Sequence, residues 1–317
     1  MATSPSATPT QHIWFGGIGN FNHPNDWSPK GVPKSGDSAT ITAGTVRASN
    51  GSLAGIDINI GSKVPDGDPI LALRNETVGD VQVMTMEAMP EEDPDPTRYA
   101  DITVAGKVTA AGAIDVGGLS LFGTGIPGNL EIRLAHGATL QVTDGLLGLA
   151  DSSVSITGQQ HSVLVNDGQI TTVGANIQID TSVTGNGNFL IEKAKFPLGS
   201  LTFDGSVSTG EHINVSEGLL NLNKPMEFLG SITENPLGRV VLATDSTSAR
   251  YANGVLTVLD HVKTVAALHI TSTVDMGFSV AVVDGQTVIR TPGSIGSSVM
   301  DPPHAMVAIH TDQHNSP

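Results

Sequence analysis

The feature that most constrains this chain is a short string of alternating apolar and polar residues that recurs between turn residues. Between residues 100 and 242 such strings occupy 102–104, 130–134, 139–142, 154–156, 177–179, 189–191, 201–203 and 219–222. Glycine, asparagine or aspartate separates nearly every pair of neighbouring strings. A side-chain period of two indicates β-strands, and no window holds a helical period of 3.6. The sequence therefore predicts an all-β protein.

Two architectures fit many short strands with frequent turns: a sandwich or barrel, and a β-helix whose coils stack along an axis. The strings are shorter than most sandwich strands. They also repeat loosely, since residues 137–145 are similar to residues 151–158. With a period of roughly 20–25 residues, residues 46–240 would form on the order of eight coils. We expect a right-handed parallel β-helix.

Composition agrees with a fold made of turns and short strands. Only 15% of the 317 residues are charged and 4% are aromatic, whereas 37 are glycine; ordinary domains are about 25% charged. The net charge of −16 disfavours nucleic acid and anionic membrane surfaces as partners. Without cysteine there is no disulfide and no cysteine nucleophile. No stretch approaches the roughly 20 apolar residues of a membrane span.

Changes in pattern divide the chain into segments. The expected segments are a disordered N-terminus (1–11), an N-terminal cap (12–45), a β-helix body (46–242) with a projecting acidic loop (89–99), C-terminal capping strands (243–290) and a loose tail (291–317). Within the capping strands, Asn253-Gly254 and Asp284-Gly285 predict hairpin turns. Caps are needed because the terminal coils of a solenoid otherwise expose unpaired backbone and apolar surface.

Two stretches resemble a known family. The first is Trp14-Phe15-Gly16-Gly17-Ile18-Gly19-Asn20-Phe21, followed by Pro24-Asn25-Asp26-Trp27-Ser28, Val32-Pro33 and Gly36-Asp37-Ser38-Ala39. It resembles the start of autotransporter-passenger-like and haemagglutinin-like β-helix surface proteins, which are common in alphaproteobacteria. The second stretch comprises 183–191, 201–207 and 220–232 and is similar to the recurring coils of those proteins. The residues after it, 251–289, are similar to the segment that usually follows these coils. The resemblance implies a β-helix and export to the cell surface.

The two tryptophans are candidates for sugar binding, because an exposed indole stacks on a pyranose ring. Trp14 and Trp27 both lie in the glycine-rich and proline-rich opening, where a bulky apolar lid over the first coil is needed. A buried indole removes a large apolar area from water. We therefore favour a capping role over a binding role.

Candidate metal ligands occur in two places. Glu91, Glu92, Asp93 and Asp95 in the acidic loop could bind Ca²⁺ through carboxylate oxygens, although charge runs are usually solvated faces. The histidines of the tail, His304, His310 and His314, do not have the spacing of a zinc site. We therefore favour the absence of a specific metal site. The one candidate cofactor that stays open is Ca²⁺ at the acidic loop.

The sequence contains no nucleophile, phosphate-binding or dinucleotide motif. A β-helix enzyme would cleave polysaccharide with paired carboxylates or a basic residue. The residues that could line such a site are Asp180, Glu192, Lys193, Lys195, Asp204 and Glu211. Nothing in the sequence brings two of them together, so we assign no catalytic residue.

These observations favour an extracellular or cell-surface structural or adhesive protein, a rigid β-rod that binds matrix polysaccharide or another surface protein. The alternatives are a polysaccharide-active β-helix lyase or hydrolase and a trimeric phage or secretion-apparatus fibre segment. The N-terminus lacks the basic and apolar regions of a signal peptide. We therefore expect secretion or surface display without a cleavable N-terminal signal peptide.

Overall fold

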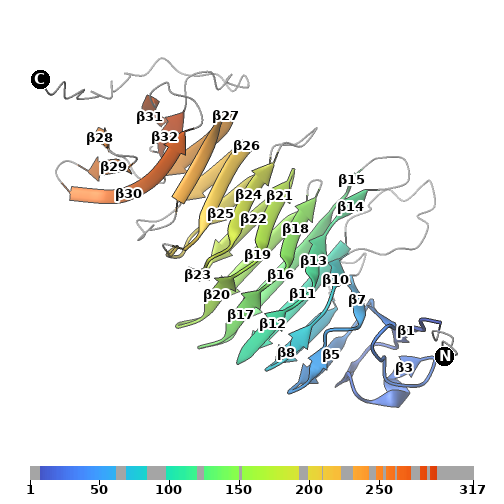
Figure 1. The fold of residues 1–317 in the computed structure, drawn as a ribbon. Helices are drawn as coiled ribbons and strands as arrows, with labels where there is room; N and C mark the ends of the chain where they lie inside the picture. The colour runs from blue at the N-terminus through green and yellow to red at the C-terminus, as the bar shows by residue number, and fades with distance from the viewer. Residues whose placement is uncertain are drawn as a thin grey trace, which may run out of the picture.

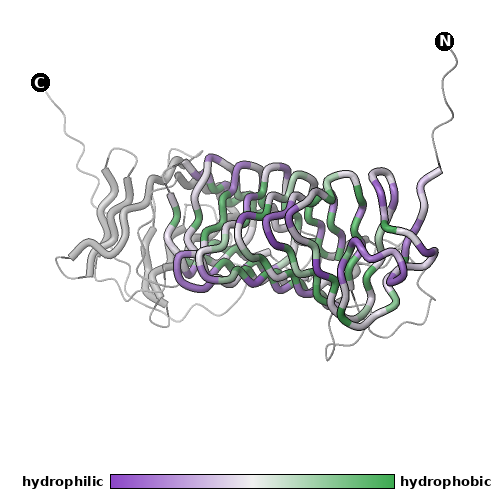
Figure 2. The backbone as a smooth tube through the Cα atoms, turned by 90° about the horizontal axis from the view of Figure 1, so that it is seen from below, coloured by the Kyte–Doolittle hydropathy of each residue, from purple (hydrophilic) through white to green (hydrophobic). Residues whose placement is uncertain are grey.

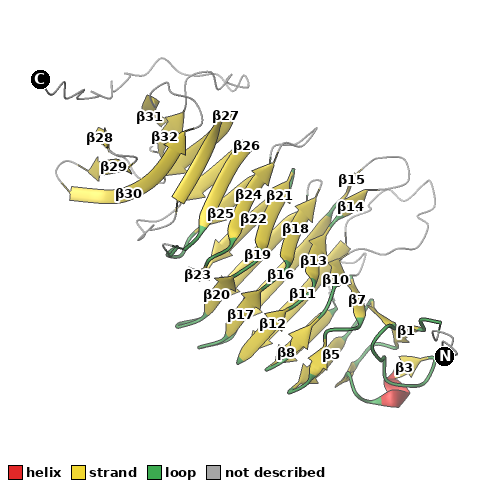
Figure 3. Ribbon diagram, viewed as in Figure 1, coloured by secondary structure: helices red, strands yellow, loops and turns green. Residues whose placement is uncertain are grey.

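The regular elements of this protein are almost all β-strands. The computed structural model describes residues 8–61, 69–83, 98–119, 125–149, 152–192, 199–208 and 210–222, followed by the strands between 231 and 290. Apart from a 3-10 turn at Pro24–Asp26, every regular element in these ranges is a strand (Figure 3). No helix in the described ranges could span a membrane. The prediction of an all-β protein is confirmed.

The strands lie on three sides of a solenoid-like stack (Figure 1). Side 1 contains β4 (Ser38–Ile41), β7 (Asp57–Ile60), β10 (Val81–Val83), β13 (Ala113–Val116), β18 (Gly145–Leu149), β21 (Gln169–Val173) and β24 (Asn188–Glu192). Side 2 contains β5 (Thr45–Ser49), β8 (Ile70–Arg74), β11 (Arg98–Ala105), β16 (Gly128–Leu134), β19 (Ser153–Gly158), β22 (Asn176–Asp180) and β25 (Ser200–Phe203). Side 3 contains β6 (Ser52–Leu53), β9 (Thr77–Val78), β12 (Lys107–Ala110), β17 (Thr139–Val142), β20 (Val163–Asn166) and β23 (Ser182–Gly185).

Each strand pairs in parallel with the strand one coil later rather than with its neighbour in sequence. Residues in contact between neighbouring coils are 19 to 33 positions apart in sequence. After β24 and β25, the long strand β26 (His212–Leu222) pairs with both of them and so forms the next rung of sides 1 and 2. The chain therefore passes along the three sides in turn. Each full turn of the chain adds one rung to every side, about 4.8 Å further along the stack.

Apolar side chains from successive rungs form ladders inside the stack. The ladder of side 1 is Ala39, Ile58, Val81, Ile114, Leu146, Ile170, Phe189 and Ile213. The ladder of side 2 is Val46, Leu71, Ile102, Ile132, Ile156, Ile179, Phe203 and Leu222. Every one of these side chains is buried. Figure 2 shows hydrophobic and hydrophilic stretches alternating along the coils. Successive residues of a strand point in turn into the stack and outward, so apolar and polar residues alternate along each strand.

Residues with left-handed backbone turn the chain at the corner between sides 2 and 3. Asn50 and Asn75 have φ angles of 58° and 49°, a conformation that asparagine tolerates better than most residues. The Asn75 side chain donates from Nδ2 to Asn50 Oδ1 at 3.2 Å. The amides of successive coils are therefore stacked and hydrogen-bonded at this corner.

The parallel stack already begins at the N-terminus. β1 (Gln11–Trp14) pairs in parallel with β4, and β2 (Ile18–Asn20) pairs in parallel with β5. β3 (Trp27–Ser28) then pairs antiparallel with β1 and covers its outer edge. The expected N-terminal cap (12–45) is therefore hydrogen-bonded into the same ladders as the β-helix body (46–242), and the boundary between them stays a prediction. β1 starts at Gln11, the last residue of the segment 1–11 that was expected to be disordered.

Strands of the C-terminal region lie against the last rungs. β27 (Ser231–Leu242) pairs in parallel with β26, and its other edge pairs with β30 (Lys263–Ser272) and β32 (Gln286–Arg290). β28 (Ser248–Ala252) with β29 (Val255–Asp260), and β31 (Ser279–Val283) with β32, form the two antiparallel pairs around the expected hairpin turns. These strands occupy the hydrogen-bonding edge that β27 would otherwise expose.

Candidate functional site

The outward residues of side 2 make a flat polar surface. Along β16, β19, β22 and β25 they are Asn129, Glu131, Arg133, Ser153, Ser155, Thr157, Asn176, Gln178, Asp180, Ser200 and Thr202. Small hydroxyl and amide groups predominate, and none of these positions is aromatic. Because the rungs are in register, these side chains form columns of mixed polar groups that repeat at about the coil spacing.

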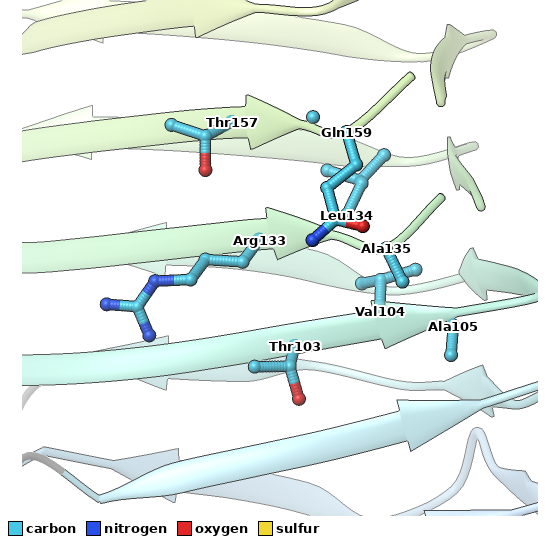
Figure 4. Close-up of a pocket in the computed structure, with 9 residues that line it drawn as sticks. Thr103, Val104, Ala105, Arg133, Leu134, Ala135, Thr157 and Gln159 are labelled. Atoms are coloured by element: carbon cyan, nitrogen blue, oxygen red, sulfur yellow. The ribbon is translucent and has the colours of Figure 1, made fainter. Parts of the chain in front are cut away.

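A shallow groove of about 540 Å³ lies at the end of these strands; we call it the Arg133 groove. Figure 4 shows Thr103, Arg133 and Thr157 on three successive strands, with Gln159 beside them. The remaining lining comes from Val104, Ala105, Leu134, Ala135 and Gly158. The groove therefore combines one cation with hydroxyl and amide groups.

Two carboxylates hold the guanidinium of Arg133. Its Nε donates to Glu131 Oε1 at 2.7 Å, and its Nη1 donates to Asp101 Oδ2 at 2.8 Å. The hydrogen bonds that Arg133 donates to Glu131, and then its bond to Asp101, raise the pKa of Arg133. Since two negative charges face one positive charge, this groove does not favour an anionic ligand.

A second groove, of about 380 Å³, lies on side 1 across three rungs; we call it the His212 groove. Gln169, Asn188 and His212 are paired neighbours on β21, β24 and β26, and all three side chains are exposed. Leu190 and Asn214 form a second column beside them. The groove therefore presents three amides and an imidazole around one partly exposed leucine.

A buried polar pair lies at the corner that leads into the His212 groove. Asn166 follows the apolar residues Leu53, Val78, Ala110 and Val142 in the ladder of side 3. Both Asn166 and Glu211 are fully buried, and Asn166 Nδ2 donates to Glu211 Oε2 at 2.9 Å. Burial is the main cause that raises the pKa of Glu211 to about 7. The sequence signal for Asn166 was its inward position in the string 163–166, which the sequence analysis did not single out.

Both tryptophans lie in the core of the N-terminal end. Trp14 is 3% exposed and Trp27 is 0% exposed. The two rings meet edge to face with centroids 5.1 Å apart, and Trp27 Nε1 donates to the Phe21 carbonyl at 2.8 Å. Neither indole offers a face on which a sugar ring could stack. Both side chains instead pack in the core at the N-terminal end.

The candidate calcium ligands Glu91, Glu92, Asp93 and Asp95 lie outside the described residues, as do the histidines of the tail. Within the part of the chain that the structure describes, no three His, Asp or Glu side chains gather as metal ligands would.

Among the candidate catalytic residues that the structure describes, Asp180 and Asp204 lie on neighbouring rungs and the others lie apart from them. Asp180 and Asp204 follow paired residues on neighbouring rungs of side 2, and Asp204 accepts a hydrogen bond from Gln178 at 2.9 Å. Glu192 is exposed at the end of β24 on side 1, whereas Glu211 is buried. Lys193 and Lys195 lie outside the described residues.

One further carboxyl group on side 1 was not singled out by the sequence. Burial, followed by the charges of Asp80 and Asp144, raises the pKa of Asp115. These aspartates come from three successive rungs, and Asp80 accepts a hydrogen bond from the Ala113 backbone at 2.9 Å. Both burial and the neighbouring carboxylates therefore disfavour the ionised form of Asp115.

Comparison of the chain with protein-family models, with curated proteins and with solved structures finds no match. The functional interpretation therefore depends on the geometry and chemistry of the faces described above.

Proposed function

We propose that this protein is an extracellular or cell-surface structural and adhesive rod, a right-handed parallel β-helix with caps at both ends, that binds neutral matrix polysaccharide in the His212 groove. The observation that carries the proposal is the alignment of Gln169, Asn188 and His212 on three successive rungs. Secretion or surface display, and any second protein partner, belong to the same proposal.

The chemistry of the groove suits the hydroxyl groups of sugars. An amide side chain both donates and accepts hydrogen bonds, and a neutral imidazole does the same through its two nitrogens. Leu190 adds an apolar contact beneath the C–H groups of a sugar ring. The chain as a whole carries a charge of −16, so a polyuronate would be repelled whereas a neutral glycan would not.

The spacing of the rungs suits a polymer. Side chains repeat about every 4.8 Å along the axis, a length comparable to one pyranose of an extended β-linked chain. A polysaccharide that follows the axis would therefore meet one new set of polar side chains per sugar. Without an exposed aromatic platform each sugar binds weakly, and affinity comes from many contacts along one chain.

Binding can be tested by isothermal titration calorimetry with cellohexaose, xylohexaose and mannohexaose, using oligogalacturonate as the anionic comparison. We expect at least one neutral hexasaccharide to bind and its disaccharide to bind more than tenfold more weakly. Asn188→Ala and His212→Ala should each weaken binding. Thr184→Ala, an exposed substitution on β23 of side 3, is the matched control and should leave binding unchanged.

The proposal fails if no neutral hexasaccharide binds, or if the control variant weakens binding as much as Asn188→Ala. Preferential binding of oligogalacturonate would contradict the electrostatic argument.

The position of Asp115 beside Asp80 and Asp144 on successive rungs favours one alternative, a polysaccharide-cleaving enzyme with paired carboxylates on side 1. Incubation with pectate, alginate and cellulose oligomers would then release new reducing ends or unsaturated products. Asp115→Asn should abolish that release. The adhesive proposal expects no product from any of these polymers.

A further inference from the structure

Asn166 and Glu211 interrupt an otherwise apolar interior. In the ladder of side 3 the positions before Asn166 are aliphatic and the position after it is Gly185. A Cβ atom on Gly185 would lie 2.1 Å from the Asn166 carbonyl oxygen, so only glycine lets the two rungs approach this closely. The Glu211 side chain, from the turn before β26, reaches Asn166 at this corner. Packing is tight, because a Cβ atom on Gly187 would lie 2.5 Å from Asn166 Cγ.

The two side chains meet with one hydrogen bond and two unused oxygens. Asn166 Nδ2 donates to Glu211 Oε2, while Asn166 Oδ1 and Glu211 Oε1 are both buried without a partner. Two buried acceptors without donors are unfavourable, because each has lost its hydrogen bonds to water without gaining a partner. A proton on Glu211 Oε1 supplies the missing donor, because a carboxylic acid and a carboxamide can pair through two parallel hydrogen bonds.

We infer that Glu211 is protonated in the folded protein and forms a cyclic carboxyl–carboxamide pair with Asn166, a pH-sensitive latch beneath the His212 groove. This inference rests on the proposed function for its role in binding, and it names the regulation of that site. In the latch, Nδ2–H of Asn166 donates to Oε2, and Oε1–H of Glu211 donates to Oδ1.

The electrostatic surroundings favour the protonated form. Burial is the largest cause of the raised pKa of Glu211, the nearby Asp167 carboxylate raises it further, and the bonds from Asn166 and the Gly187 backbone oppose the shift. Asp167, in the turn after β20, is the charged group that faces Glu211 from the packed elements. The next residue in the sequence, His212, is titratable and begins β26 with its side chain exposed.

The direction of the pH effect follows from linkage. The folded-state pKa of about 7 lies above the usual value of 4.5. The stabilisation is therefore complete below the unfolded-state pKa, and it is lost as the pH rises through 7. Above that pH a buried carboxylate faces the Asn166 oxygen and Asp167.

The latch is connected to the groove through the backbone. Asn166 Nδ2 also lies 3.4 Å from the Asn188 carbonyl oxygen, and the His212 N–H donates to the Gly187 carbonyl at 3.1 Å. Asn188 and His212 both line the groove. Loss of the latch would therefore shift the two rungs that hold the ligand, and glycan binding should weaken above pH 7.

Glu211→Gln tests the latch, because the glutamine amide can donate to Asn166 Oδ1 and accept from Nδ2 at any pH. Urea unfolding followed by circular dichroism between pH 5 and pH 8.5 gives the readout without any ligand. The unfolding constant of the wild type should rise by about one to two orders of magnitude more than that of the variant. Glu192→Gln, which removes an exposed carboxylate of β24, should behave as the wild type.

The wild type provides a second readout should the variant fold poorly. In protein labelled with ¹³C at glutamate side-chain carboxyls, one resonance should titrate near pH 7. The proposed latch is contradicted if the unfolding constants of the wild type and Glu211→Gln change equally with pH. It is also contradicted if every glutamate resonance titrates below pH 5.5.

Binding of the hexasaccharides over the same pH range separates the two proposals. If the unfolding and NMR results hold but no glycan binds at any pH, the latch stands and the proposed function fails. If glycan binds equally well to both proteins at every pH, the proposed function stands and the latch does not regulate it.

Discussion

The ladder of side 2 makes a strong prediction at Ile156. Its side chain is fully buried between Ile132 and Ile179 on the neighbouring rungs. Ile156→Ala removes three buried carbons at about 0.8 kcal/mol each, about 2.4 kcal/mol in all. The cavity left behind adds on the order of 1 kcal/mol, because neighbouring rungs held by backbone hydrogen bonds collapse only partly. We therefore expect the free energy of unfolding to fall by about 3–4 kcal/mol.

The assay is urea denaturation followed by far-UV circular dichroism. Ser155→Ala, an outward substitution on the same strand, is the matched control and should change stability by less than about 0.5 kcal/mol. A second probe is available because Trp14 and Trp27 both lie at the N-terminal end. Tryptophan fluorescence and circular dichroism should coincide if the rod unfolds as one unit. A larger loss for Ser155→Ala than for Ile156→Ala would refute the register, since a one-residue slip exchanges inside and outside.

Three further substitutions test other parts of the structure by the same denaturation assay. Gly44→Ala should lower the free energy of unfolding by more than about 1 kcal/mol. Gly44 has a φ angle of 77°, and a Cβ atom there would lie 2.2 Å from the Gly17 carbonyl oxygen. Unchanged stability would contradict the close approach of the chain to Gly17 at this turn. Trp27→Phe should lower the free energy of unfolding by about 2–3 kcal/mol, because the variant loses buried volume and the hydrogen bond to the Phe21 carbonyl. The apparent melting temperature should therefore fall. An unchanged melting temperature would contradict the position of Trp27 in the core. Arg133→Ala should lower the free energy of unfolding by about 1–3 kcal/mol, because it leaves the nearly buried Asp101 without its cation. Arg133→Lys should restore only part of that stability.

Much of the fold could be predicted from local pattern. Strings such as 130–134 and 177–179 are strands with their apolar residues inside, as a period of two requires. The strands within 12–45 could not be predicted, because the glycine-rich and proline-rich composition of this segment hides strands that pair with distant parts of the chain. Pairing partners are a long-range property that local composition does not encode.

The candidate site was less accessible to sequence reasoning. Gln169, Asn188 and His212 form one column only because their rungs are in register. The coil length varies too much for that alignment to be read from spacing. Glu211 was noted as a candidate catalytic carboxylate, but it is fully buried and accepts a hydrogen bond from Asn166, 45 positions earlier in the sequence. Only the three-dimensional stack brings these residues together.

The most direct test of the stacked rungs uses engineered cysteines, since the chain has none of its own. Ser153 pairs with Asn176, which pairs with Ser200 on the next rung. Neighbouring rungs are about 4.8 Å apart, within the Cα separation of a disulfide, whereas alternate rungs are about 10 Å apart and beyond it. Mild oxidation should cross-link Ser153→Cys with Asn176→Cys quantitatively and leave Ser153→Cys with Ser200→Cys reduced. Cross-linking of the second pair, or none in the first, would contradict the stack on which the whole account depends.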